Sequence, residues 1–111
     1  YERGDVLCVP SRYDGWGLVV PEGLASGLPV IASDRMGAGL EFVESGRNGW
    51  LVPAEDEDAL FAAMREAALM PLDEMRCRAR ESVSEHTLRS GAQRFLDYAQ
   101  RVIAQWQLLQ D

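Results

Sequence analysis

Two carboxylates eight residues apart, Asp14 and Glu22, are the first groups in this sequence whose types and spacing suit chemistry. Asp14 lies in a segment rich in glycine and aromatic residues, and Glu22 follows Pro21, which is common at the first position of a helix. Side chains in a first helical turn lean toward the helix amino terminus, so we expect both carboxylates to face one crevice. Ionised carboxylates accept hydrogen bonds from hydroxyls, which suits a sugar or a ribose diol.

The residues between the two carboxylates favour close contact between a ligand and the backbone. Gly15 and Gly17 carry no side chain to hold a ligand away. The N–H groups of Gly17, Leu18 and Val19 lie beside the predicted helix start, where a phosphate group is favoured. The segment therefore predicts carboxylates for ligand hydroxyls and backbone amides for ligand phosphates.

Each of these residues also has a purely structural alternative. Glu22 is equally suited to interact with the helix dipole, and Gly15 and Gly17 to form a turn. Trp16 has the alternative of a partly exposed packing residue, and Gly27 that of a helix cap with no ligand. The joint pattern of carboxylates, glycines and proline favours the functional interpretation.

Short apolar and β-branched runs, separated by helical patterns, predict the elements that position these groups. Three strands are predicted, at 5–9, 29–33 and 50–52. Helical segments are predicted at 21–27, 41–44, 57–70, 72–83 and 88–109. The first strand has the composition of a buried strand in a parallel sheet.

Strands that alternate with helices predict an α/β fold, a partial Rossmann-like domain with three parallel strands. We expect one domain over residues 1–111, with the three-stranded part at about 3–70 and terminal helices at about 71–111. One edge strand would stay bare unless further sequence or a second copy covers it. Ligands of such sheets bind beyond the carboxyl ends of the strands, from which the loops 11–19, 34–40 and the region after Pro53 emerge.

Composition disfavours several classes of partner. The chain carries a net charge of -7 over 111 residues, which repels nucleic acid and anionic lipid. Its apolar runs are far shorter than the roughly 20 residues of a membrane-spanning helix. Cys8 and Cys77 show neither CxxC nor zinc-ligand spacing, so we expect no metal and a thiol-reduced, cytoplasmic protein.

The run from Ser11 to Ser33, SRYDGWGLVVPEGLASGLPVIAS, resembles the signature of family 4 retaining glycosyltransferases, which have the GT-B fold. That signature has two Glu eight residues apart around Gly-Phe-Gly-Leu, followed by Ala-x-Gly-x-Pro-Val-Ile. The later segments 37–43 and 46–53 also resemble the family. This sequence departs from it at Asp14, where the family has Glu, and at Trp16, where it has Phe.

The resemblance implies a function and assigns roles to residues. It implies that Glu22 binds the donor ribose and that Asp14 reaches the transferred sugar, both as catalytic residues. Donor-binding residues would be Gly15, Trp16, Gly17, Leu18, Val19 and Glu22. The implied reaction transfers a hexosyl group from a nucleoside diphosphate sugar to an acceptor hydroxyl with retained configuration, without a metal ion or any cofactor besides the donor substrate.

Complete enzymes of this family have two Rossmann-like domains, so the resemblance implies that this chain is a carboxyl-terminal fragment and inactive alone. Its partners would be the nucleotide-sugar donor, the missing amino-terminal domain, and a glycan or lipid-linked acceptor. The full-length enzyme would be cytoplasmic or at the inner face of the membrane. Trp106, Leu108 and Leu109 on the last helix would be exposed or buried in a homodimer. Alternatives are a non-catalytic nucleotide-sugar-binding module, a GT-B epimerase or phosphorylase, and a structural half-domain with a relict motif.

Overall fold

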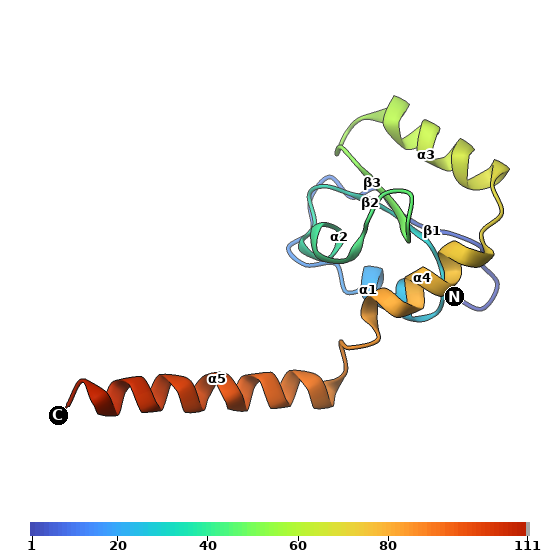
Figure 1. The fold of residues 1–111 in the computed structure, drawn as a ribbon. Helices are drawn as coiled ribbons and strands as arrows, with labels where there is room; N and C mark the ends of the chain where they lie inside the picture. Colours follow the sequence, from blue (N-terminus) through green and yellow to red (C-terminus); the bar gives the residue numbers. More distant parts are fainter. Residues whose placement is uncertain (111) are drawn as a thin grey trace.

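The computed structural model describes residues 1–110 as a small α/β body followed by one long helix (Figure 1). The elements, in chain order, are β1 (Leu7–Val9), α1 (Val19–Ala25), β2 (Val30–Ser33), α2 (Gly37–Phe42), β3 (Gly49–Val52), α3 (Glu57–Leu69), α4 (Asp73–Val83) and α5 (Leu88–Leu108). The strands form one sheet in the order β1-β2-β3, and both pairings are parallel. The predicted partial Rossmann-like fold with three parallel strands is confirmed.

The central strand β2 divides the core into two clusters because its side chains alternate between the two faces of the sheet. Val30 and Ala32 belong to one cluster, and Ile31 belongs to the other. The first cluster contains residues from α1, β2, α2 and α4 and consists of Val20, Leu24, Val30, Ala32, Met36, Ala38, Phe42, Val43, Ala79 and Val83. The second contains residues from β2, β3, α3 and α4 and consists of Ile31, Trp50, Val52, Ala63, Ala67 and Met75. Helices therefore cover both faces of the sheet.

The first strand differs from its prediction in length and in burial. It begins at Leu7, two residues later than expected, and Cys8 is exposed while Leu7 and Val9 are half-buried. The prediction of a buried strand was wrong because β1 is an edge strand with β2 on one side. Within residues 1–110, no strand pairs with its other edge.

Two helix starts also differ from the sequence prediction. Pro21 is the third residue of α1, which begins at Val19, so its expected place at the first helical position was wrong. Helix α2 spans Gly37–Phe42 rather than 41–44. Its glycines are poor helix formers, but the burial of Ala38 and Phe42 outweighs that preference.

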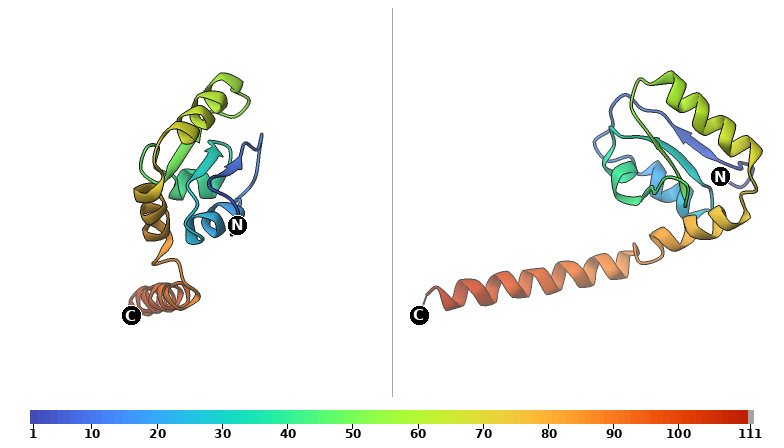
Figure 2. Two further views of the ribbon diagram at one scale, coloured as in Figure 1. Left: turned by 90° about the vertical axis from the view of Figure 1, so that its right-hand side faces the viewer. Right: turned by 45° about the horizontal axis from the view of Figure 1, so that its top comes forward.

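The last helix projects from the body as an isolated rod (Figure 2), and the described chain measures 63 Å along its longest axis. None of its residues is buried, and Trp106 is 60% exposed. Of the two alternatives for this apolar face, the single chain shows the exposed one. No helix within residues 1–110 has the length and apolar character needed to cross a membrane.

Candidate functional site

Loops from all three strands meet at the carboxyl edge of the sheet, as predicted. The buried Ser33 hydroxyl at the end of β2 donates a 2.6 Å hydrogen bond to the carbonyl of Ser11, which follows β1. The carboxylate of Asp34 accepts a 2.9 Å hydrogen bond from the N–H of Ala54, which follows β3. These side chain–backbone bonds hold the three loops in one arrangement.

A cavity of about 370 Å³ lies between these loops and the start of α3. Its lining comes from the loops after β1 and β3, from the last residues of β2 and β3, and from α3, and consists of Pro10, Arg12, Ser33, Val52, Pro53, Ala54, Glu55, Asp56, Glu57 and Leu60. Arg12 and Glu55 form an exposed ion pair of 3.4 Å at this edge. Glu55 has a φ of 62°, a left-handed conformation that no glycine marks in the sequence. The loops around this cavity were predicted to lie at this edge, but none of its lining residues was predicted as a site residue.

Asp14 is held by the backbone that continues the pairing between β1 and β2. Its N–H donates a 3.0 Å hydrogen bond to the carbonyl of Arg35, and it forms a parallel bridge with Met36. Its Oδ1 accepts a 3.1 Å hydrogen bond from the N–H of Trp16. The half-buried carboxylate therefore has one oxygen engaged in a local turn and a backbone fixed by the neighbouring strand.

Of the two glycines next to Asp14, Gly17 is structurally required and Gly15 is not. Gly17 has a φ of 86°, which favours glycine, and a Cβ there would lie 3.3 Å from the sulfur of Met36 and 3.7 Å from Oδ2 of Asp14. A Cβ on Gly15 would meet no atom within 4 Å. The Asp14 carboxylate thus adjoins Gly17, immediately before α1.

The backbone amides predicted to meet phosphate lie where α1 begins. Val20 donates its N–H to the carbonyl of Gly17 over 3.0 Å, closing the turn into the helix. The N–H groups of Gly17, Leu18 and Val19 have no protein acceptor within residues 1–110. Leu18 is exposed, whereas Val19 is half-buried and packs against the core.

Glu22 lies in the first turn of α1, and its exposed side chain has a partner that sequence reasoning missed. Its Oε2 accepts a 2.8 Å hydrogen bond from the hydroxyl of Tyr1, 21 residues earlier. This hydrogen bond, with smaller contributions from desolvation and the negative charge of Glu22, raises the pKa of the Tyr1 hydroxyl. No sequence signal connects the two residues, because the contact depends on how the segment before β1 passes α1.

The indole of Trp16 packs against α2. A Cβ on Gly37 would lie 2.7 Å from the Trp16 ring, and the ring meets Phe42 edge-on with centroids 6.0 Å apart. The carbonyl of Trp16 accepts a 2.8 Å hydrogen bond from the N–H of Ala38. Since 46% of Trp16 is exposed, it combines a packing role with an accessible surface.

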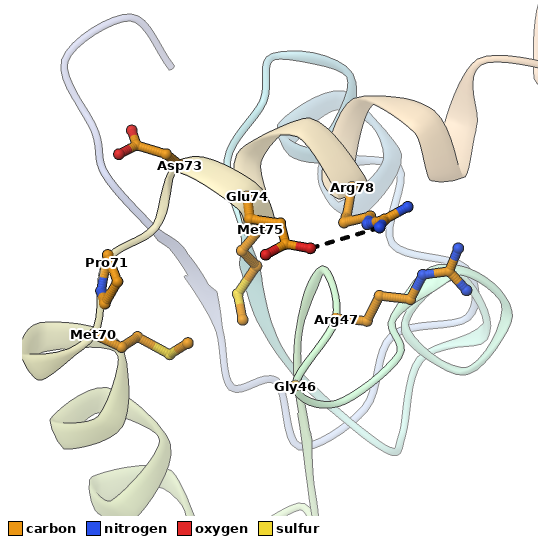
Figure 3. A pocket seen from close by; sticks show the side chains of 8 residues that line it. All are labelled: Gly46, Arg47, Met70, Pro71, Asp73, Glu74, Met75 and Arg78. Atoms are coloured by element: carbon orange, nitrogen blue, oxygen red, sulfur yellow. Dashed lines mark ion pairs between the residues drawn. The ribbon is translucent and has the colours of Figure 1, made fainter.

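A larger hollow, of about 660 Å³, contains none of the predicted site residues (Figure 3). Gly46, which lines it, precedes β3, so this hollow lies toward the amino end of that strand. Arg78 and Glu74 form an ion pair of 3.5 Å on one wall. Within residues 1–110, no three His, Cys, Asp or Glu side chains gather closely enough to hold a metal ion.

Comparisons with known proteins place the chain in a family. The family model described as "Glycosyl transferases group 1" matches residues 1–69, which include Asp14, Glu22 and all three strands. The chain therefore belongs to this glycosyltransferase family, and the predicted resemblance is confirmed at that level.

Individual relatives agree with this assignment. The chain is 40% identical over 86 residues to a D-inositol 3-phosphate glycosyltransferase of Corynebacterium glutamicum, covering 78% of this chain and 20% of that protein. It is 30% identical over 115 aligned positions, covering all of this chain and 22% of that protein, to the GtfA subunit of a UDP-N-acetylglucosamine–peptide N-acetylglucosaminyltransferase of Streptococcus gordonii.

A solved structure shows the same fold. The sucrose-phosphate synthase of Thermosynechococcus elongatus superposes with a TM-score of 0.78 and 30% identity, over 91% of this chain and 26% of that one. The described fold is therefore similar to GT-B glycosyltransferase structures. The chain spans about a fifth of the length of the curated relatives it matches.

Proposed function

We propose that the full-length protein is a glycosyltransferase that moves a glycosyl group from a nucleoside diphosphate sugar to an acceptor hydroxyl with retained anomeric configuration. Residues 1–111 supply the donor-binding half. The observation that carries this proposal is that the Asp14 carboxylate adjoins Gly17 in the loop between β1 and α1, and that Glu22 lies in the first turn of α1, all within the family-matched region. Ligands of open α/β sheets bind at this edge.

The proposed roles follow the chemistry of each group. The exposed Glu22 carboxylate accepts hydrogen bonds from hydroxyls of the donor ribose, and the Asp14 carboxylate contacts the transferred sugar. The N–H groups of Gly17, Leu18 and Val19, which lack protein acceptors within residues 1–110, bind the diphosphate. In this proposal, catalysis needs no metal ion and no cofactor besides the donor.

The remaining parts of the enzyme lie outside residues 1–111. A second Rossmann-like domain binds the acceptor, a glycan or a lipid-linked molecule, so this fragment alone transfers no sugar. We place the enzyme in the cytoplasm or at the inner face of the membrane, and the transferred group is a hexosyl residue. The apolar side chains of α5 are exposed in the single chain. In the full-length protein, another domain or a second copy covers this surface.

Calorimetric titration of the full-length protein with UDP, GDP and ADP, with and without Mg²⁺, tests the donor site. We expect one nucleotide to bind, and Glu22→Ala to weaken it by about tenfold or more, because a hydrogen bond to a charged group contributes roughly 1.5–3 kcal/mol. Glu66→Ala, on the exposed side of α3, is the matched control and should bind like the unaltered protein.

The opposite outcomes are equally clear. Equal affinity of the Glu22→Ala and Glu66→Ala variants would contradict the assigned role of Glu22, and strict dependence on Mg²⁺ would contradict the metal-independent reaction. Nucleotide binding by a protein that transfers no sugar to any tested acceptor would favour the non-catalytic binding module. NMR of the product's anomeric carbon decides between retention and inversion.

A further inference from the structure

We propose that Tyr1 is a positioning residue for Glu22: its hydroxyl holds one carboxylate oxygen, so that the other is presented to a ribose hydroxyl of the donor. This inference rests on the proposed function. It starts from the 2.8 Å hydrogen bond that the Tyr1 hydroxyl donates to Oε2 of Glu22. Both side chains are exposed to solvent.

A partner for Glu22 matters because its side chain is long and solvent-exposed. Helix α1 fixes its backbone, but an exposed glutamate carboxylate samples several rotamers. Binding a ligand hydroxyl then requires the loss of that freedom, which lowers affinity. A protein group that already donates a hydrogen bond to one carboxylate oxygen restricts the side chain before the ligand binds, and so removes part of this loss.

Tyr1 can serve as such a donor because the segment that carries it is attached to α4. The Gly4 N–H donates to the carbonyl of Tyr1 over 3.2 Å, which closes a turn. Arg76 of α4 pairs with Asp5 at 2.6 Å and also reaches the carbonyl of Gly4 at 3.4 Å. Tyr1 is thus linked through this turn to a packed helix.

The chemistry of the pair predicts how it recognises a ribose. An ionised carboxylate offers two oxygens, and Tyr1 takes up a hydrogen-bonding position on Oε2 of Glu22. The raised pKa of Tyr1 favours the protonated, donating form of its hydroxyl. Oε1 of Glu22 keeps all its acceptor sites, whereas Oε2 has one of them occupied. Tyr1 therefore biases Glu22 toward contact through Oε1 with one ribose hydroxyl, where discrimination against a deoxyribose should be greatest.

Nucleotide binding to the full-length protein tests this inference with Tyr1→Phe, Glu22→Gln, the double variant and Tyr98→Phe. Tyr98 lies exposed on α5 and provides the matched control for removal of a phenolic hydroxyl. The probes are UDP, GDP and ADP, followed by the 2′-deoxy and 3′-deoxy forms of the nucleotide that binds.

We expect Tyr1→Phe to weaken binding about three- to tenfold while Tyr98→Phe binds normally, because the Tyr1 variant loses the ordering of the Glu22 carboxylate and no contact with the ligand itself. In the Glu22→Gln background the same change should alter affinity by less than about twofold, because contacts that act through each other are non-additive. Discrimination between the 2′-deoxy and 3′-deoxy forms should weaken in Tyr1→Phe. The midpoint of thermal unfolding should stay unchanged, which separates positioning from a loss of folding.

A spectroscopic measurement is independent of the ligand. In protein labelled with ¹³Cζ-tyrosine, the Tyr1 resonance is the one that disappears in Tyr1→Phe. The pKa of the Tyr1 hydroxyl, measured from this resonance, should be lower in Glu22→Gln than in the unaltered protein. No such decrease would overturn the inference, as would unchanged or tighter nucleotide binding by Tyr1→Phe. Binding that needs Glu22 but not Tyr1 would overturn this inference alone, whereas no nucleotide binding by the unaltered protein would overturn the proposed function as well.

Discussion

Helices α4 and α5 follow each other in the chain, yet their burial is the reverse of what their compositions suggest. Helix α4, DEMRCRARESV, is mostly charged, but Met75, Ala79 and Val83 are buried and the helix packs against α1. Helix α5 has a continuous apolar face and buries no residue. The apolar pattern of a helix predicts which face is available for packing, but whether that face is covered depends on what lies opposite.

The two helices also differ in how their first turns are stabilised. Helix α5 has a side-chain cap, in which Oγ1 of Thr87 accepts a 3.1 Å hydrogen bond from the N–H of Ser90. The first turn of α4 has no side-chain cap hydrogen bond. Local signals therefore support α5, whereas tertiary packing supports α4.

Introducing a charged side chain should give the largest difference in stability loss between α4 and α5. In residues 1–111, Ala79→Asp places a carboxylate at a position with 0% exposure and should destabilise the body by about 3 kcal/mol or more. Ala92→Asp on exposed α5 is the matched change and should stay within about 0.5 kcal/mol. Urea unfolding measures both, and similar losses would mean that α5 is packed in solution.

Removal of an apolar side chain should show a smaller contrast. Met75→Ala leaves a cavity between α4 and α3 and should cost about 2–4 kcal/mol, whereas Leu96→Ala, 53% exposed, should cost less than about 1 kcal/mol. The same urea experiments on the full-length protein sharpen the comparison. A large loss for Leu96→Ala in the full-length protein alone would show that α5 is covered there.

One substitution should have opposite signs in the two regions. Gly17→Ala forces a side chain into a φ of 86° with a Cβ 3.3 Å from the Met36 sulfur, and should destabilise the body by about 1–2 kcal/mol. Gly91→Ala, in the first turn of α5 and with open space around its Cβ, should stabilise that helix by roughly 0.5–1 kcal/mol. Circular dichroism of the helix and urea unfolding of the body measure the two effects. A stabilising Gly17→Ala would contradict the constraint assigned to this loop.

The local structure around the candidate site residues could be predicted because they lie within one short segment. Asp14, Gly17 and Glu22 belong to one loop and the helix that follows it, and the glycines and apolar spacing of this segment predicted both, although Pro21 placed the helix start two residues too late. The packing of Trp16 against α2 and the contact between Tyr1 and Glu22 were not predictable, since each joins segments that only the fold brings together.

The sequence by itself determined the element types, the parallel α/β arrangement and the edge of the sheet where a site belongs, because period, breakers and glycines act locally. Tertiary structure decided that β1 is an exposed edge, that α2 begins at Gly37, and that α5 packs against nothing within residues 1–110. It also decided the partner of Glu22 and the cavity beside Glu55. These features depend on which distant segment lies opposite, and local spacing carries no information about that.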